Sequence, residues 1–218
     1  MSSPEAELRG VWAHLAAGAP AGTATDHLLD ALLGRLGEPH RRYHTAAHVM
    51  WVVRHVHALA HLLEHADDVA DVELAALYHD AVYDPLRNDN ESLSARLAAS
   101  VAAELGWSAA RCDTVHRLVM ATAEHRPTDA AEAVLVDADL AVLGGDPRSY
   151  SAYVTGIRAE YAHVDDEGWR QGRATVLRHF LDGDQVFHTA PMRAEREARA
   201  RANITAELAA LRPSRPVQ

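Results

Sequence analysis

The sequence predicts an all-α protein, a single domain of about ten helices with no significant sheet. Two observations carry this prediction. Alanine, leucine, arginine and glutamate, which favour helices, dominate the chain, and runs of β-branched residues are short. Apolar residues also recur at helical intervals, as where His48 is followed by Val52 and Leu59 on an inward-facing stripe.

Short breaks divide the chain into the expected helices. These helices cover residues 3–17, 23–36, 44–65, 71–83, 91–105, 108–125, 129–143, 147–163, 166–182 and 191–211. Asp71 and Asn90 have side chains that can cap the helices beginning beside them. Gly106 suits the position just past a helix end, and Ser108 can begin the next helix. The Gly-Gly-Asp-Pro sequence at 144–147 is a clear break.

The length and composition favour one domain. The chain has 218 residues, of which 48% are hydrophobic, and this is enough for one substantial core. It contains no internal repeat and no long linker. We therefore expect a single domain over residues 1–211 and a flexible C-terminal tail over residues 212–218.

The charged residues of the chain argue against a nucleic-acid partner and against lysine-dependent mechanisms. The formal net charge is −10, so we expect no nucleic-acid polymer as a partner. All 21 basic residues are arginine. This excludes mechanisms that need a lysine Schiff base or a phosphate-loop lysine.

The cysteine content and the apolar pattern indicate a cytoplasmic protein. Cys112 is the only cysteine, so neither an intrachain disulfide nor a cysteine-rich zinc site can form. Residues 1–5 do not resemble a signal peptide, and no uninterrupted apolar run of about 18 residues predicts a membrane span. We expect no membrane contact.

His79-Asp80 is the most informative pair in the sequence. It lies late in an apolar helical segment, where two polar residues require a reason. A neutral histidine nitrogen and an anionic aspartate oxygen suit a divalent cation of borderline hardness.

Two other segments could complete a metal site. His44 and His48 are four residues apart, so they would share one face of a helix. Asp137 and Asp139 interrupt an apolar helical run and point in different directions, so at most one of them is expected to join the histidines. Four ligands from three helices could surround one metal ion and leave positions for water and substrate.

The order His…His-Asp…Asp resembles that of the HD superfamily of metal-dependent phosphohydrolases, and in particular its small bacterial branch of predicted phosphohydrolases. The resemblance spans residues 8–211. The segments that carry it are Arg42-Tyr43-His44 with His48, His79 to Asp84, Asp89 to Glu91 with Ser94-Ala95, Asp137 to Leu140 with Leu143-Gly144, Ile157 to Tyr161, and Gly172-Arg173.

The resemblance implies an HD-type helical bundle around one divalent metal ion. The implied ligands are His48, His79, Asp80 and Asp139. Asp139 is favoured because the final ligand of the superfamily typically follows a small residue, here Ala138, and Asp137 is the alternative. Manganese, iron, cobalt, nickel and zinc are all compatible with these ligands.

The resemblance also implies catalytic roles. A metal-activated water would attack the substrate, and Asp80 would join metal binding to the positioning of that water. Glu91 could act as a general base, with proton handling by His44 or His125.

Phosphate binding would need cationic donors. Arg42, Arg158 and Arg173 lie in family-like segments, and a guanidinium can bind phosphate oxygens with two parallel hydrogen bonds. The structural alternative is that these arginines form ion pairs. The carboxylates nearby in the sequence are those of Glu160, Asp165 and Asp166.

The expected function is that of a metal-dependent hydrolase, specifically a phosphohydrolase acting on a small phosphorylated metabolite or nucleotide. Three alternatives stay open: a noncatalytic HD module that senses a nucleotide, a metalloenzyme acting on a non-phosphate bond, and a di-iron oxygenase. The protein is expected to be a monomer or a homodimer.

Overall fold

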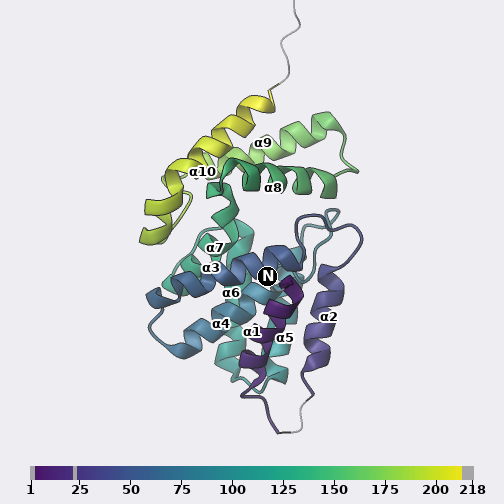
Figure 1. The fold of residues 1–218 in the computed structure, drawn as a ribbon, viewed down its shortest axis with the longest axis vertical. Coiled ribbons are helices and arrows are strands. Elements are labelled where there is room, and N and C mark those ends of the chain that lie inside the picture. The colour runs from purple at the N-terminus through teal and green to yellow at the C-terminus, as the bar shows by residue number, and fades with distance from the viewer. Residues whose placement is uncertain (1–2, 22–23, 213–218) are drawn as a thin grey trace, which may run out of the picture. The chain divides into compact units, whose positions relative to one another are not determined.

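The structure, a computed structural model, describes residues 3–21 and 24–212. Within these residues the chain forms α-helices and short 3-10 helices but no strand (Figure 1). The elements are α1 (Pro4–Ala16), α2 (Asp26–Leu36), α3 (Ala46–Leu59), η1 (Ala60–Leu62), α4 (Ala66–Tyr78), α5 (Asn90–Glu104), α6 (Ala109–Glu124), α7 (Ala130–Leu140), η2 (Ala141–Gly144), α8 (Pro147–Glu160), α9 (Asp166–Asp182) and α10 (Ala190–Ala210). The all-α prediction is confirmed, and so is the number of helices within the described residues.

The chain divides into two compact units, Met1–Asp139 and Leu140–Gln218. The first unit contains α1 to α6 and nearly all of α7, and the second contains η2 and α8 to α10. The boundaries predicted for one domain stay a prediction. Apart from Arg212, the predicted flexible tail lies outside the described residues.

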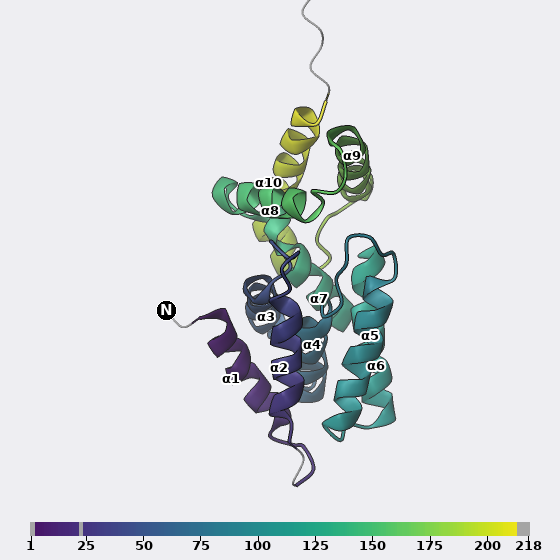
Figure 2. The same cartoon turned by 90° about the vertical axis from the view of Figure 1, so that its right-hand side faces the viewer.

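Helix α4 is the centre of the first unit. It packs against α1, α3, α5 and α6, and every residue of its segment 71–78 is buried. Figure 2 shows α5 and α6 running side by side, and these two helices also pack against each other and against α4. A helix surrounded on all sides can carry polar residues only where they have partners.

The start of α4 differs from the prediction. The helix begins at Ala66, and the carboxylate of Asp68 accepts a hydrogen bond from the backbone N–H of His65 at 3.2 Å. Asp71 is therefore not the cap. It lies inside the helix, is buried, and accepts a 2.7 Å hydrogen bond from Arg111. Both aspartates suit a helix start by type, but Asp71 is held by a side chain from α6.

The signals at Gly106 and Ser108 are confirmed. Gly106 follows the end of α5 with φ at +80°, a conformation that glycine adopts without strain. The N–H of Gly106 donates to Ala103 and that of Trp107 to Ala102, the hydrogen bonds that close a helix end. The hydroxyl of Ser108 accepts a hydrogen bond from the third residue of α6.

The second unit confirms the break predicted at 144–147. Helix α8 starts with Pro147, and the carboxylate of Asp146 accepts 2.9 Å hydrogen bonds from the backbone of Arg148 and Ser149. Glycine is needed at 144, because a Cβ there would stand 2.6 Å from the Cβ of Arg196 in α10. This close approach lets η2 pack against α10.

Candidate metal centre

His79 and Asp80 lie at the end of α4, not inside a helix reaching residue 83 as predicted. The helix ends at Tyr78, His79 follows at its C-terminal cap, and the next residues form turns. His79 is 2% exposed, whereas the side chain of Asp80 is 19% exposed. The pair is thus held by the buried central helix while the carboxylate remains accessible.

His48 comes from the first turn of α3 and is also buried. Thr45 occupies the N-cap position of that helix without a capping bond from its side chain, so His44 lies just before the helix and not on its face as predicted. The two histidines nevertheless meet, with ring centroids 5.6 Å apart in an edge-to-face arrangement. The extended backbone of Thr45 turns the chain so that His44 approaches from outside the helix.

The donor atoms of three residues converge. The Nε2 atoms of His48 and His79 are 3.2 Å apart. The Oδ2 atom of Asp80 lies 3.1 Å from His79 Nε2 and 3.5 Å from His48 Nε2. His48, His79 and Asp80 therefore form a group that could hold a metal ion.

Asp139 reaches the same group from α7. Its Oδ1 atom lies 3.3 Å from His48 Nε2 and 3.6 Å from His79 Nε2. Asp137, two residues earlier, is fully buried and has interactions of its own. The position of the Asp139 carboxylate makes it the better candidate for a fourth ligand.

The nitrogen–nitrogen and nitrogen–oxygen separations in this donor set suit a single small cation. Ligand atoms about 2.1 Å from one ion stand about 3.0 Å apart at right angles and about 3.4 Å apart in a tetrahedron. The distances from Asp80 and Asp139 oxygens to the two imidazole nitrogens run from 3.1 to 3.6 Å. Two nitrogens and two carboxylate oxygens also match the chemistry of a borderline divalent metal.

The hydrogen bond on the far side of the His79 ring favours the tautomer that a metal needs. Nδ1 of His79 lies 2.9 Å from the carbonyl oxygen of Ala76. A carbonyl only accepts, so Nδ1 carries the proton and, in the neutral ring, Nε2 keeps its lone pair. That lone pair points toward the cluster. A histidine that binds a metal is commonly oriented in this way.

The cluster is electrostatically coupled. Burial alone would lower the pKa of His79, but Asp80 and Asp139 outweigh it and raise that pKa well above its usual value. The same balance raises the pKa of His48. Burial opposes ionisation of Asp80 and Asp139, yet the histidines hold the pKa of each carboxyl well below its usual value. The two carboxylates thus favour a positive charge on the neighbouring histidines or between the four side chains.

Arg41, which the sequence analysis did not select, holds the backbone around this cluster. Its buried guanidinium donates to the carbonyl oxygens of His44 at 3.0 Å, Asp80 at 2.8 Å and Ala81 at 3.1 Å. The sequence offered only an Arg-Arg pair beside His44, and the family-like segment drew attention to Arg42. Nothing local distinguishes the buried member of that pair.

The turn after Asp80 is also held from α5. The hydroxyl of Ser94 accepts from the N–H of Val82 at 3.0 Å and donates to its carbonyl at 3.2 Å. The side-chain amide of Asn90 bonds both backbone groups of Asp84. Asn90 is therefore not the predicted helix cap. Its side chain bonds the turn instead, and Asp89 occupies the N-cap position.

Of the other predicted catalytic residues, the structure brings two to the cluster. His44 Nε2 lies 3.8 Å from Oδ2 of Asp80, and His125 Nε2 lies 3.5 Å from Oδ2 of Asp139. Glu91, by contrast, lies half-buried in the first turn of α5, and among the described residues no hydrogen bond or ion pair joins it to the cluster. His125 ends α6 in the left-handed region, with φ at +54°.

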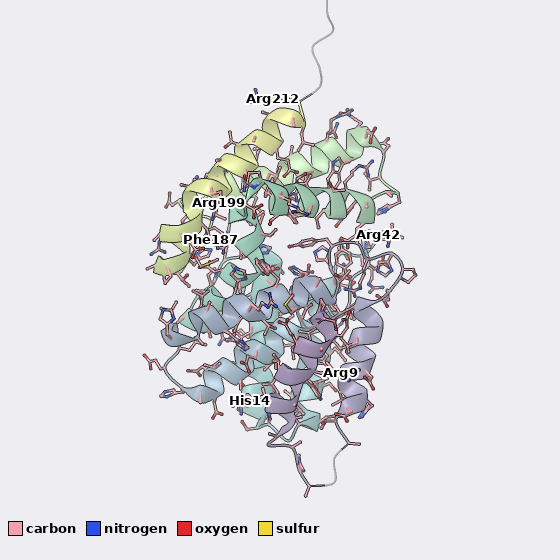
Figure 3. The ribbon with its side chains drawn as sticks, viewed as in Figure 1. Arg9, His14, Arg42, Phe187, Arg199 and Arg212 are labelled. Carbon is pink, nitrogen blue, oxygen red and sulfur yellow. The ribbon has the colours of Figure 1, made fainter. Side chains whose placement is uncertain are left out.

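Arg42 lies on the segment before α3 and is exposed (Figure 3). Its guanidinium donates to the backbone carbonyls of Pro39 and Arg41. These bonds hold the guanidinium close to its own segment. Arg42 thus lies on the surface of the unit that contains the cluster.

Arg158 and Arg173 lie in the second unit, and both are engaged there. Arg158 pairs with Asp166 at 2.8 Å, one of the carboxylates expected for the structural alternative. Arg173 is buried and donates two hydrogen bonds to Glu207, at 2.8 and 3.1 Å. Phosphate binding by these two arginines stays a prediction, whereas their ion pairs give each a structural role.

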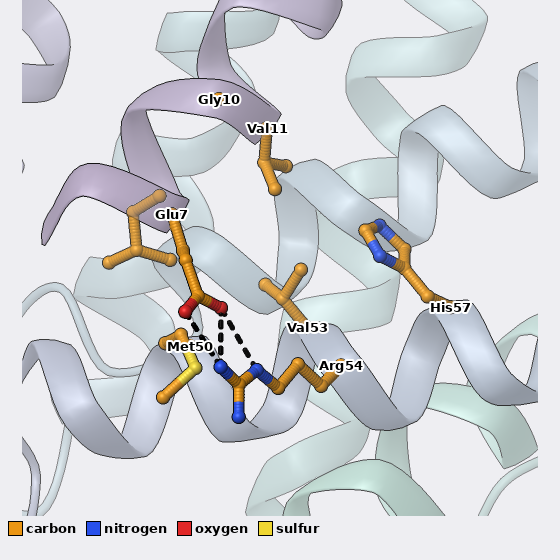
Figure 4. Close-up of a pocket in the computed structure, with 8 residues that line it drawn as sticks. Glu7, Gly10, Val11, Met50, Val53, Arg54 and His57 are labelled. Carbon is orange, nitrogen blue, oxygen red and sulfur yellow. Dashed lines mark hydrogen bonds and ion pairs between the residues drawn. The ribbon is translucent and has the colours of Figure 1, made fainter. Parts of the chain in front are cut away.

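A separate groove lies between α1 and α3 (Figure 4), with a volume of about 360 Å³. Glu7 and Arg54 face each other across part of it, with two N–H groups of Arg54 bonded to the carboxylate. None of the candidate ligands lines this groove. It is therefore distinct from the candidate metal centre.

Comparison of the chain with protein-family models, with curated proteins and with solved structures gives no match. Among the described residues, none of the helices combines the length and the apolar character that a membrane crossing requires.

Proposed function

We propose that the chain is a metal-dependent hydrolase, a phosphohydrolase that acts on a small phosphorylated metabolite or nucleotide. The observation that carries this proposal is the convergence of His48, His79, Asp80 and Asp139. These side chains come from three separate helical segments, and each carboxylate has an oxygen within 3.1 to 3.6 Å of both imidazole nitrogens.

The donor set fits one divalent cation, held by the two imidazole Nε2 atoms and by one oxygen of each carboxylate. Such an ion, when bound, would polarise a phosphoryl oxygen and make a water more acidic. His79 is fixed in the ligand tautomer through Ala76. The resemblance to the HD superfamily belongs to this proposal, since the order of the four ligands along the chain is the same.

The residues beside the ligands supply the remaining chemistry. His44 and His125 lie beside different carboxylates: His44 is near Asp80, and His125 is near Asp139. A histidine in either place can take or give a proton at the substrate. No hydrogen bond or ion pair joins Glu91 to the cluster among the described residues, so these two histidines are the stronger candidates for proton handling.

Aromatic side chains surround His44 beside the proposed ligands. Tyr43 and Tyr83 flank His44, with ring centroids at 5.1 and 4.1 Å from the His44 ring. Arg42 is exposed on the same segment and offers a cation for phosphate oxygens. A cytoplasmic location and a monomeric or homodimeric state complete the proposal, in agreement with the single cysteine of the chain.

A phosphate-release screen tests the reaction. Purified protein is incubated with nucleotides and sugar phosphates in the presence of manganese, iron, cobalt, nickel or zinc. We expect release from at least one substrate class, and loss of that release in His48→Ala and Asp80→Asn. His57→Ala is the matched control, because His57 lies on the same helix as His48 but pairs with Glu73 instead.

The screen also separates the alternatives. Activity that survives both ligand substitutions would contradict the proposed site. Tight nucleotide binding without turnover would indicate a sensing module, and two bound irons with no phosphate release would indicate an oxygenase. Cleavage of a non-phosphate ester through the same ligands would keep the site and change the substrate.

A further inference from the structure

Arg41 is a buried cation with an unusual set of partners. Its side chain is 0% exposed. Three of its hydrogen bonds go to backbone carbonyls, those of His44, Asp80 and Ala81. It also pairs with the carboxylate of Glu38, which lies 3.2 Å away and is 37% exposed. A charge in such a place needs its hydrogen bonds, because burial without partners is strongly unfavourable.

These bonds join two segments that are far apart in the sequence. The carbonyl of His44 belongs to the segment that leads into α3 and His48, whereas the carbonyl of Asp80 belongs to the candidate ligand itself. One planar guanidinium therefore holds the backbone of both segments. The guanidinium also lies 5.5 Å from the centre of the Tyr83 ring, which covers it.

The location at the end of α4 strengthens this contact. The last carbonyls of a helix and of the turn that follows lack helical partners and carry partial negative charge. Arg41 supplies donors for the carbonyls of Asp80 and Ala81 just beyond that end. The turn that carries Asp80 is thus held by α5 through Ser94 and by Arg41 from the other segment.

We infer that Arg41 is a positioning residue for the metal centre, which sets the distance between His48 and Asp80 by clamping the backbone carbonyls of His44 and Asp80. This inference rests on the proposed metal site. Arg41 touches neither the cation nor the substrate. It acts by keeping the ligand separations at the values that one ion requires.

Arginine and lysine differ at such a position. Lysine keeps the charge, but its single ammonium cannot hold three carbonyls in the fixed geometry of a guanidinium. Arg41→Lys should therefore bind metal about 10- to 100-fold more weakly than wild type, as substitutions around metal ligands commonly do. Arg111→Lys is the matched control. Arg111 binds Asp71, which lies in α4 like the residues leading to His79, but away from the cluster.

The test measures metal affinity and the spectrum of the bound ion. Apo protein is titrated with Co²⁺, whose visible absorption reports coordination geometry, and thermal unfolding is followed in parallel. We expect a weaker and altered Co²⁺ spectrum in Arg41→Lys. Arg111→Lys should lose stability while keeping the wild-type affinity and spectrum.

Glu38→Ala provides a second variant if Arg41→Lys does not fold. Glu38 is half-exposed, and its removal deletes the hydrogen bond from Nε of Arg41. The positive charge of Arg41 itself stays in place. A severalfold loss of Co²⁺ affinity is expected. Unchanged affinity and spectrum in a folded Arg41→Lys, or in Glu38→Ala where Arg41→Lys fails to fold, overturns the inference. Failure of the wild-type protein to bind Co²⁺ instead contradicts the proposed function.

Discussion

Among single residues, His79 joins the buried helix α4 to the candidate metal centre. One ring nitrogen bonds the carbonyl of Ala76 inside α4, and the other faces two carboxylates and a second histidine. Two neutral histidines and two carboxylates leave two negative charges in a confined space. A divalent cation would neutralise them, whereas without a cation protons on the histidines must do so.

The charge balance predicts a pH dependence. The carboxylates of Asp80 and Asp139 raise the pKa of His79 above 6.5, so His79 stabilises the metal-free fold fully below pH 6.5 and loses that effect as the pH rises through its folded pKa. Protein treated with a chelator should therefore melt at progressively lower temperature above pH 6.5. Metal-loaded protein should not, because the ion replaces the proton.

Thermal unfolding between pH 6 and 9, with and without chelator, measures this effect. The comparison is best made in His57→Ala, since Glu73 also raises the pKa of His57 and gives a slope of the same sign. A chelated protein whose melting temperature is independent of pH across this range would contradict the expectation.

The choice between the two aspartates of α7 is also testable at single residues. Asp139→Asn should weaken metal binding at least about tenfold, because the amide cannot supply the anionic oxygen near His48 and His79. Asp137→Asn, a substitution of the same size two residues away, should keep the affinity for metal. Isothermal titration of both variants decides between them, and the reverse order of effects would make Asp137 the ligand.

At the scale of helices, the end of α6 has a conformational cost. His125 has φ at +54°, which is unfavourable by about 1 kcal/mol for a residue with a side chain. Glycine avoids that cost, so His125→Gly should raise the free energy of unfolding by about 1 kcal/mol while it lowers phosphate release. Such an exchange of stability for activity would support a functional reason for His125 beside Asp139.

His116→Gly is the control for this substitution. His116 lies within α6, where glycine is unfavourable by about 1 kcal/mol, so stability should fall and activity should persist. Urea unfolding of the two variants gives the comparison. Destabilisation by His125→Gly would mean that the contacts of the imidazole outweigh the backbone strain.

The turn between α4 and α5 has its own test. Ser94→Ala removes both hydrogen bonds to the backbone of Val82 in a buried place, and it should destabilise the fold by about 1–3 kcal/mol. Metal affinity should fall as well, because the turn carries Asp80. Ser92→Ala is the matched control, since the hydroxyl of Ser92 accepts a hydrogen bond from the exposed side chain of Arg96 and not from the turn. Equal effects from both would show that the turn does not depend on Ser94.

The helices were predictable from the sequence, but their ends near the site were only partly so. Gly106 and Ser108 act through local backbone geometry, which sequence alone reveals. Asp71 and Asn90 look like caps but are bound by distant partners, Arg111 and the backbone of Asp84. Local signals cannot identify partners that only the folded chain supplies.

The candidate ligands show the same division. His79-Asp80 stood out because two polar residues interrupt an apolar run, and the structure brings them to His48 and Asp139. Arg41 could not be distinguished from its neighbour Arg42, because burial of one arginine in a pair depends on tertiary packing. Likewise, Glu91 matched a family-like segment although no hydrogen bond or ion pair joins it to the cluster among the described residues.

At the scale of the whole molecule, each unit has its own buried polar network. In the second unit, Arg173 is bonded to Glu207 and to the hydroxyl of Tyr153, and Tyr150 also donates to Glu207. Removing one partner of a buried ion pair leaves the other charge uncompensated. Arg173→Met should therefore lower the free energy of unfolding by about 3–5 kcal/mol.

The same variant separates a structural role from substrate binding. Arg173→Met protein that remains folded at low temperature should keep the wild-type Michaelis constant. The guanidinium of Arg173 is already paired with Glu207, so its loss should not affect substrate binding. Arg170→Met, which affects an exposed pair with Glu167 on the same helix, should change neither stability nor activity. A large rise in the Michaelis constant without loss of stability would instead assign Arg173 to the substrate.

The proposed function depends on a single divalent ion held by His48, His79, Asp80 and Asp139. Elemental analysis of the protein purified after expression in metal-supplemented medium tests it most directly, with the double variant His79→Ala/Asp80→Asn beside it and His57→Ala as the control. We expect about one transition metal per chain in the wild type and in His57→Ala, and almost none in the double variant. A wild-type protein without metal, or equal metal in a folded double variant, would contradict it.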